Sequence, residues 1–130
     1  MKMIMSEQDK LLYKELGSAN HSRLEPYIKL FEELVPEAGI SFYNPTVLYL
    51  TVKGQISLGL SPRKQYISLY MGSMETMKIF RELLPRLGKV KTGVGCINIR
   101  KHSDLNEEVL KEAFVRIANS DHTGAYGFGS

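Results

Sequence analysis

Residues 46–71 read TVLYLTVKGQISLGLSPRKQYISLYM, and this stretch decides the fold. Apolar and polar residues alternate along much of it, which is typical of β-strands because successive side chains point to opposite faces of a sheet. Two short turn sequences, at residues 53–54 and 61–64, divide the stretch into separate runs. Strands joined by such short turns pair in antiparallel fashion. The stretch therefore predicts a three-stranded antiparallel meander.

The runs of this meander differ in their patterns. Residues 46–53 are almost continuously apolar, β-branched or aromatic, which predicts a strand that is central or covered on both faces. In residues 65–71 the apolar side chains point to one face, while Tyr66, Ser68 and Tyr70 point to the other. The third strand is therefore expected to have one buried face and one polar face.

Four segments outside the meander carry apolar residues at helical spacing, where positions i, i+3, i+4 and i+7 share one face. They are residues 6–16, residues 22–35, residues 73–87 and the segment that follows Asp104. The first segment is short, so we expect it at the periphery. The longer ones are expected to pack on the core.

Two of these helices have a proline near an end. For the second helix, Ser22 with Glu25 forms a capping box, whereas Pro26 fits as the first helical residue after a Glu25 cap, and both starts stay open. Pro85 has no backbone N–H to donate. The last turn of the third helix is therefore expected to be kinked or 3₁₀ before Gly88 ends it.

Two further strands are expected at residues 40–43 and 96–101, so the predicted sheet has four or five strands. Helices mainly on one face of this sheet make the chain an α+β protein. At 130 residues the chain supports one hydrophobic core, and therefore a single domain over residues 21–119. Residues 1–20 add a peripheral helix, and the glycine-rich residues 120–130 form a flexible tail.

Charge and cysteine content limit the classes of function. The net charge of +3 and the pI near 9.0 permit an anionic ligand, but they fall short of the Lys and Arg loading typical of nucleic-acid binding. A single cysteine cannot form an internal disulfide, and neither a signal peptide nor an apolar run of membrane-spanning length is present. We therefore expect a cytoplasmic protein whose partner is neither nucleic acid nor membrane.

Residues 88–101, GKVKTGVGCINIRK, concentrate glycines and basic side chains. Lys89 and Lys91, with a backbone bent at Gly93, can present ammonium and N–H groups to an anion, as phosphate-binding loops do. The spacing is not that of a nucleotide-binding motif. The alternative is that the glycines only shape a turn and the lysines only keep the surface soluble.

Alternation places further polar side chains on one sheet face. Tyr66 and Tyr70 on one strand, and Asn98 and Arg100 on another, point away from their apolar neighbours. If helices leave that face open, its tyrosine and arginine side chains are accessible. These two residue types are enriched at binding surfaces. Alternatives are a face covered by helices, tyrosines that pack as ordinary edges, and a homodimer formed through the exposed face. The candidate ligand-binding residues are Tyr43, Lys64, Tyr66, Tyr70, Lys89, Lys91, Gly93, Asn98 and Arg100.

Catalytic signatures are weak in this sequence. Cys96 is a candidate nucleophile only with an activating neighbour, and the sequence places no histidine beside it. A small residue at the start of a strand is more often packed in the interior. The order of residues matches neither a Ser-His-Asp triad nor a paired-carboxylate site. The residues therefore favour a binding protein over an enzyme.

Several segments resemble the YdhG-like domain family, a bacterial family of unknown function. The similarity covers residues 27–118. It implies a YdhG-like α+β domain and, as described for some members, a frataxin-like iron-binding role in iron-sulfur cluster assembly. One departure is Gly39, where family members often carry an acidic residue. The most specific pieces are Pro-Glu-Ala at 36–38, Tyr-Asn-Pro at 43–45, and the Gly-Lys, Gly-x-Cys and Ser-Asp-Leu elements within residues 88–105.

Iron held in the frataxin manner needs clustered surface carboxylates, which are hard oxygen donors. Glu32, Glu33 and Glu37 lie on or just after the second helix, and they are the candidate metal ligands. The alternative is a solvated helix face on which glutamates pair with lysines four residues away. The histidines show no ligand spacing, so a tight transition-metal site is not expected. The leading hypothesis is a cytoplasmic binding protein, for which the resemblance implies frataxin-like iron handling without a required cofactor. The alternative is a small-anion or metabolite-binding module that uses the tyrosine and arginine sheet face and the basic glycine loop.

Overall fold

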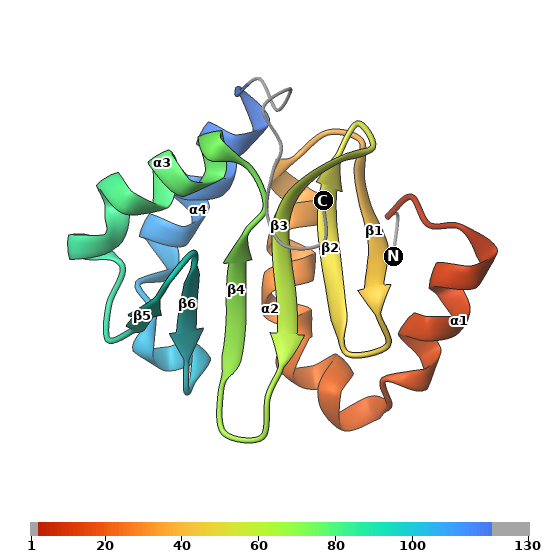
Figure 1. Ribbon diagram of the computed structural model, residues 1–130. Helices are drawn as coiled ribbons and strands as arrows, with labels where there is room; N and C mark the ends of the chain where they lie inside the picture. The colour runs from red at the N-terminus through yellow and green to blue at the C-terminus, as the bar shows by residue number, and fades with distance from the viewer. Residues whose placement is uncertain (1–2, 121–130) are drawn as a thin grey trace.

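The predicted meander forms the centre of a larger sheet in the computed structural model, which describes residues 3–120. The strands are β1 (Ala38–Asn44), β2 (Val47–Val52), β3 (Gln55–Pro62), β4 (Ile67–Met71), β5 (Lys91–Gly93) and β6 (Cys96–Ile99). They pair in antiparallel fashion in the order β1-β2-β3-β4-β6-β5 (Figure 1). Of the expected tail, residues 121–130 lie outside the described residues.

The α+β class and the single domain are confirmed, but the sheet has six strands where four or five were expected. The additional strand is β5, whose three residues are all exposed and pair with β6. An exposed strand of this length has no buried face, and therefore no alternation for the sequence to display. The glycines at its end form the tight turn into β6, where Gly95 has a φ of 69°.

The helices described within residues 3–120 are α1 (Glu7–Glu15), α2 (Ser18–Leu34), α3 (Met74–Leu83) and α4 (Glu107–Ala118), with 3₁₀ turns η1 (Leu84–Arg86) and η2 (His102–Asp104). Pro85 lies in η1, which confirms the expected 3₁₀ turn before Gly88. α1 buries none of its residues, as a peripheral helix should. None of the helices in residues 3–120 combines the length and the apolar character needed to cross a membrane.

The start of α2 differs from both predicted starts. The helix begins at Ser18, ahead of Ser22 and Pro26, so the proline lies inside it. Gly17 explains the earlier start. Its φ of 85° turns the chain between α1 and α2, and its carbonyl accepts the N–H of His21 at 3.0 Å.

The sequence predicts Ser73 as the cap of α3 and Asp104, with Glu107, as the cap of α4, and only the first of these predictions is confirmed. Ser73 caps α3, and its hydroxyl accepts the N–H of Thr76 at 3.1 Å. Asp104 does not cap α4, because it belongs to η2 and the helix begins only after the chain has left that turn. The cap is Asn106, whose side chain accepts the N–H of Val109 at 3.4 Å.

The hydrophobic core lies between the sheet and the helices α2, α3 and α4, with α2 and α4 behind the sheet in Figure 1. Phe31 of α2 and Phe114 of α4 meet edge to face, with ring centroids 5.2 Å apart. Leu58, Leu69 and Ile97 supply the sheet side of this layer and are buried. Each fully buried side chain of this size contributes about 1.5 to 3 kcal/mol, so the helix-covered face dominates stability.

Residues ahead of α1 cover the outer edge of β1. Ile4 forms a parallel bridge with Gly39, and its carbonyl accepts the N–H of Ile40 at 2.9 Å. A Cβ at Gly39 would lie 2.8 Å from the Ile4 carbonyl oxygen and 2.7 Å from Thr51 Oγ1. Both distances are too short for a side chain at this position. Packing therefore requires the glycine that departs from the pattern of the resembled family.

Candidate functional site

A cavity of about 330 Å³ opens beside the ends of β5 and β6. Its walls are formed by Tyr66, Lys89, Val90, Lys91, Asn98, Arg100 and Asp104. The ligand-binding candidates among them are Tyr66, Lys89, Lys91, Asn98 and Arg100. We call this hollow the cationic cavity.

Antiparallel register brings these residues together from distant parts of the chain. Asn98 of β6 pairs with Ser68 of β4 on one side and with Lys91 of β5 on the other. Paired residues share a face of the sheet, and so do residues two positions apart along a strand. Arg100 therefore continues the face that carries Asn98, and Tyr66 comes beside it from the start of β4.

The cationic cavity has an excess of positive charge. Lys89, Lys91 and Arg100 share it with a single carboxylate, that of Asp104. Within the described residues, none of these cationic side chains forms an ion pair. Like charges held close together repel one another. An anion that enters the cavity relieves this repulsion.

Gly88 fixes one wall of the cationic cavity. The N–H of Lys89 donates to the Asp104 carbonyl at 2.9 Å, and the N–H of Asn106 donates to the Leu87 carbonyl at 2.7 Å. A Cβ on Gly88 would collide with that same Asp104 oxygen, and its φ of 119° also favours glycine. Only glycine allows this close approach, which sets Lys89 beside Asp104.

Tyr66 and Asn98 are held in ways that leave their side-chain groups at the cavity. The Tyr66 carbonyl accepts the N–H of Arg63 at 2.8 Å and the guanidinium of Arg23 at 3.0 Å. The residue itself is 36% exposed. On β4 the Ser68 hydroxyl donates to Asn98 Oδ1 at 2.8 Å. This hydrogen bond turns the Asn98 amide hydrogens toward other acceptors.

The other ligand-binding candidates lie outside the cationic cavity. Tyr43 is on β1, and β2 and β3 separate it from β4. Lys64 is exposed in the turn between β3 and β4. Tyr70 accepts a hydrogen bond from Arg63 at 2.6 Å, and this bond raises the pKa of the arginine guanidinium. Gly93 lines a different hollow.

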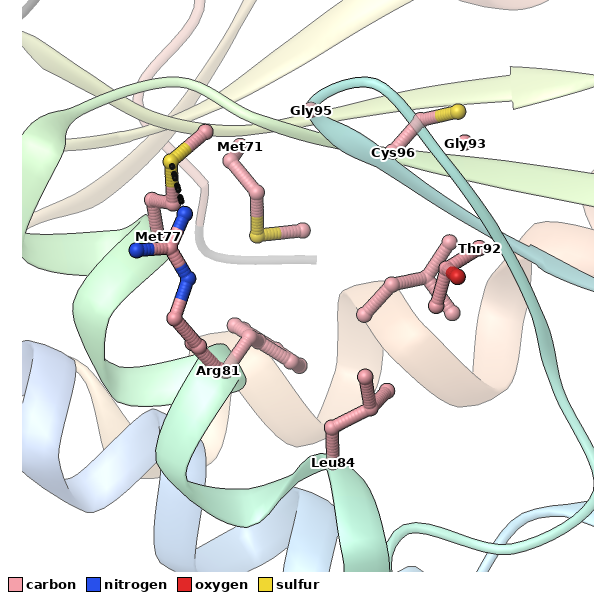
Figure 2. Close-up of a pocket in the computed structure, with 10 residues that line it drawn as sticks. Met71, Met77, Arg81, Leu84, Thr92, Gly93, Gly95 and Cys96 are labelled. Atoms are coloured by element: carbon pink, nitrogen blue, oxygen red, sulfur yellow. Dashed lines mark hydrogen bonds between the residues drawn. The ribbon is translucent and has the colours of Figure 1, made fainter.

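That second hollow, of about 200 Å³, lies between α3 and the β5–β6 hairpin (Figure 2). Met71, Met77 and Leu84 surround it and make it largely apolar. Arg81 stands at its rim, where the guanidinium lies 3.5 Å from the Met77 sulfur. Cys96 belongs to its wall, but the thiol points away from the methionines (Figure 2). We call it the apolar hollow.

Of the three glutamates predicted as metal ligands, only two line the same hollow. Glu32 and Glu37 line a third hollow, of about 230 Å³, together with Ile4. Glu33 is exposed and is not part of that lining. Across residues 3–120, no group of three or more His, Cys, Asp or Glu side chains is placed to hold a metal ion. Iron binding by the three glutamates stays a prediction.

Val90 and Asp104 line the cationic cavity but are absent from the predicted set, and Asp104 is the charged one of the two. The sequence context of Asp104 explains why it was missed. Its position after a strand and before a helix indicates a cap, which is a local role. Its place in the cavity depends instead on the bridge between Gly88 and Leu105, which joins segments on either side of the β5–β6 hairpin. No local pattern announces such a contact.

Comparisons with known proteins give no relative from which a function could be transferred. No family model, no curated protein and no solved structure matches the chain. The resemblance to the YdhG-like family therefore stays a hypothesis, and the geometry of the cationic cavity is the basis for a functional proposal.

Proposed function

We propose that the chain is a binding protein for a small anion, which it holds in the cationic cavity. The observation that carries the proposal is the convergence of Lys89, Lys91 and Arg100 on one hollow without an ion pair among the described residues. Clustered cations at a concave surface create a positive potential that concentrates anions. The cavity volume of about 330 Å³ lies within the range of about 300 to 1,000 Å³ that is typical of small-ligand sites.

Each polar group in the cavity has a distinct part in this function. Arg100 offers a planar guanidinium, which binds two oxygens of a carboxylate or phosphate at once. Lys89 and Lys91 offer compact positive charges. The Asn98 amide adds a neutral donor whose orientation the Ser68 hydroxyl fixes. Together these groups favour a ligand with several anionic oxygens over a monatomic ion.

Calorimetric titration with inorganic phosphate, pyrophosphate and citrate at low ionic strength tests the proposal. We expect saturable binding of at least one of these anions, and a loss of about tenfold in affinity for Arg100→Ala and for Lys91→Ala. A hydrogen bond to a charged group is worth about 1.5 to 3 kcal/mol, and about 1.4 kcal/mol corresponds to tenfold. Low ionic strength is needed because salt screens exposed charges.

Lys101→Ala is the matched control, because this exposed lysine follows Arg100 directly and does not line the cavity. It removes the same charge from the same segment, and we expect its affinity to stay within about twofold of the wild type. If Lys101→Ala weakens binding as much as Arg100→Ala, the attraction is a diffuse surface effect and the proposal fails. Failure of all of these anions to bind rejects it as well.

A second proposal is frataxin-like iron handling that supports iron-sulfur cluster assembly. It rests on the family resemblance and on the shared hollow of Glu32 and Glu37. Anaerobic titration with Fe(II) is expected to show saturable binding that Glu37→Gln weakens. Glu108→Gln, an exposed glutamate on α4, is the control and should leave it unchanged. Iron binding that is equal in both variants, or that is not saturable, rejects this second function.

We also propose a cytoplasmic location. The only cysteine is free, whereas small secreted domains are usually stabilised by internal disulfides. Cell fractionation checks it. Pairing of two copies through the outer sheet face stays a prediction, and light scattering of the purified chain tests it.

A further inference from the structure

The cationic cavity is chemically uneven. Lys89 and Lys91 lie on the side of β5, whereas Tyr66 forms the wall next to β4. Arg100 lies between them, because β6 is the middle strand of the three. Neighbouring strands are about 4.8 Å apart, so roughly two such spacings separate the tyrosine from the lysines. A ligand that fills the cavity therefore meets positive charge at one end and an aromatic side chain at the other.

The backbone carbonyl of Tyr66 holds the turn, while its ring lines the cavity and its phenol group interacts electrostatically with the Arg63 guanidinium. That carbonyl accepts hydrogen bonds from Arg63 and Arg23, whereas no ring among the described residues stacks on the Tyr66 ring. A tyrosine kept 36% exposed at a cavity wall offers a flat surface. Planar groups, including nucleobases, stack on such surfaces.

Besides the cations and the aromatic ring, Asp104 and Asn98 offer the cavity a hydrogen-bond acceptor and a neutral donor. The Asp104 carboxylate can only accept hydrogen bonds when it is ionised, so it suits ligand hydroxyl groups and opposes a second anionic group. Asn98 Oδ1 is occupied by the Ser68 hydroxyl at 2.8 Å, which leaves its amide as a donor. A sugar that joins a phosphate to a planar base supplies hydroxyl groups that can donate to Asp104 and oxygens that can accept from the Asn98 amide.

We propose that the anion is the phosphate of a mononucleotide, whose base stacks on Tyr66 and whose phosphate lies against Lys89, Lys91 and Arg100. This inference rests on the proposed anion-binding function and narrows its ligand class to a sugar phosphate monoester that carries an aromatic base. The volume of about 330 Å³ suits a single small ligand and not a polymer. With only these cations in the cavity, the site neutralises one phosphate group.

Calorimetry with three probes that share a phosphate tests this inference: inorganic phosphate, ribose 5-phosphate and adenosine monophosphate. We expect adenosine monophosphate to bind about tenfold more tightly than ribose 5-phosphate, because stacking of a base on an aromatic side chain contributes about that factor. Tyr66→Ala should abolish the difference, and Tyr66→Phe should retain it because the ring stays. Tyr43→Ala, which removes an exposed tyrosine outside the cavity, should change neither affinity.

The outcomes separate this inference from the function on which it rests. Equal affinities for adenosine monophosphate and ribose 5-phosphate overturn the nucleotide assignment and leave the anion site in place. Failure of all phosphate probes and of citrate to bind removes both. A short oligoadenylate with a 5′-phosphate carries the same chemistry from a second source. If it binds more tightly than adenosine monophosphate, the assignment to a free mononucleotide is wrong, and weaker or equal binding supports it.

Discussion

Residues of β6 line two hollows of opposite character, the apolar hollow and the cationic cavity. Ile97 borders the apolar hollow and belongs to the core, together with Ile99. Asn98 and Arg100, the alternate residues, line the cationic cavity. A single short segment therefore contributes to both sides of the sheet. We call the side that packs against the core the dry side, and the side that holds the cationic cavity the wet side.

The difference between the two sides teaches how little sequence is needed to build a site on an antiparallel sheet. The apolar residues of β6 fix its register against the core, because a shift by one residue would expose them. Once the register is fixed, the intervening positions are placed with it, and the Asn98 side chain is oriented by one hydrogen bond from Ser68. These positions can then carry polar groups for binding at little further cost to folding.

The largest contrast should appear when adjacent residues of this segment are shortened. Ile99 is 1% exposed and packs in the core, so Ile99→Ala is expected to lower the free energy of unfolding by about 2 to 5 kcal/mol. Arg100→Ala, one residue later and exposed, should change it by no more than about 0.5 kcal/mol. Urea unfolding of both variants measures this. Equal losses of stability would show that the two sides of the strand are not energetically distinct.

Alkaline pH tests the helix-covered side of the sheet through one buried tyrosine. Tyr27 of α2 is 1% exposed, and burial raises its pKa to about 12 from an ordinary value of about 10. Because the pKa is higher in the folded state, the associated stability is complete below pH 10 and is lost as the pH rises to about 12. The expected loss is roughly 2 to 3 kcal/mol. Urea unfolding at both ends of this window should show it in the wild type, and Tyr27→Phe should lack this component.

Most of the fold could be predicted because its signals are local. The meander and the helices are specified by periods of two and of about 3.6 residues, which any short window of sequence displays. The errors fall where the signal is not periodic. β5 has no buried face, and α2 begins early because Gly17 adopts a positive φ that lets the chain turn into the new helix at once.

The candidate site was predictable only in part, for a reason that is also physical. Alternation and charge pick out Tyr66, Asn98 and Lys91 individually, but only the strand order places them around one cavity. That order is a long-range property, since β6 returns to pair with β4 after α3 intervenes. The same local signals also select Tyr43, which the sheet carries to its far edge.

A pair of glycines tests whether the wet side depends on one close approach. Gly88 and Gly54 both have positive φ values, but an added Cβ meets the Asp104 carbonyl at Gly88 and nothing within 4 Å at Gly54. Gly88→Ala should cost roughly 1 to 3 kcal/mol of stability and also weaken phosphate binding, because Lys89 and Asp104 are forced apart. Gly54→Ala bears the strain of positive φ without that displacement, so its phosphate affinity should be unchanged. Unchanged phosphate affinity in Gly88→Ala would mean that the close approach of Gly88 to the Asp104 carbonyl does not shape the cavity.

The smallest expected effect concerns the hydroxyl groups on the polar face. Ser68 donates to Asn98 Oδ1 at 2.8 Å, and Ser61 donates to the Thr46 carbonyl at 2.9 Å. Both serines are nearly fully buried, so Ser68→Ala and Ser61→Ala should each lower the free energy of unfolding by about 1 kcal/mol. Their effects on ligand affinity should differ, because only Ser68 orients a side chain of the cationic cavity. We expect phosphate affinity to fall by about twofold to fivefold in Ser68→Ala and to stay constant in Ser61→Ala. Calorimetric titration measures this, and the two variants are comparable because their stabilities should be equal. Equal phosphate affinities in the two variants would mean that the Ser68 hydroxyl contributes to folding alone and that its hydrogen bond to Asn98 does not matter for binding.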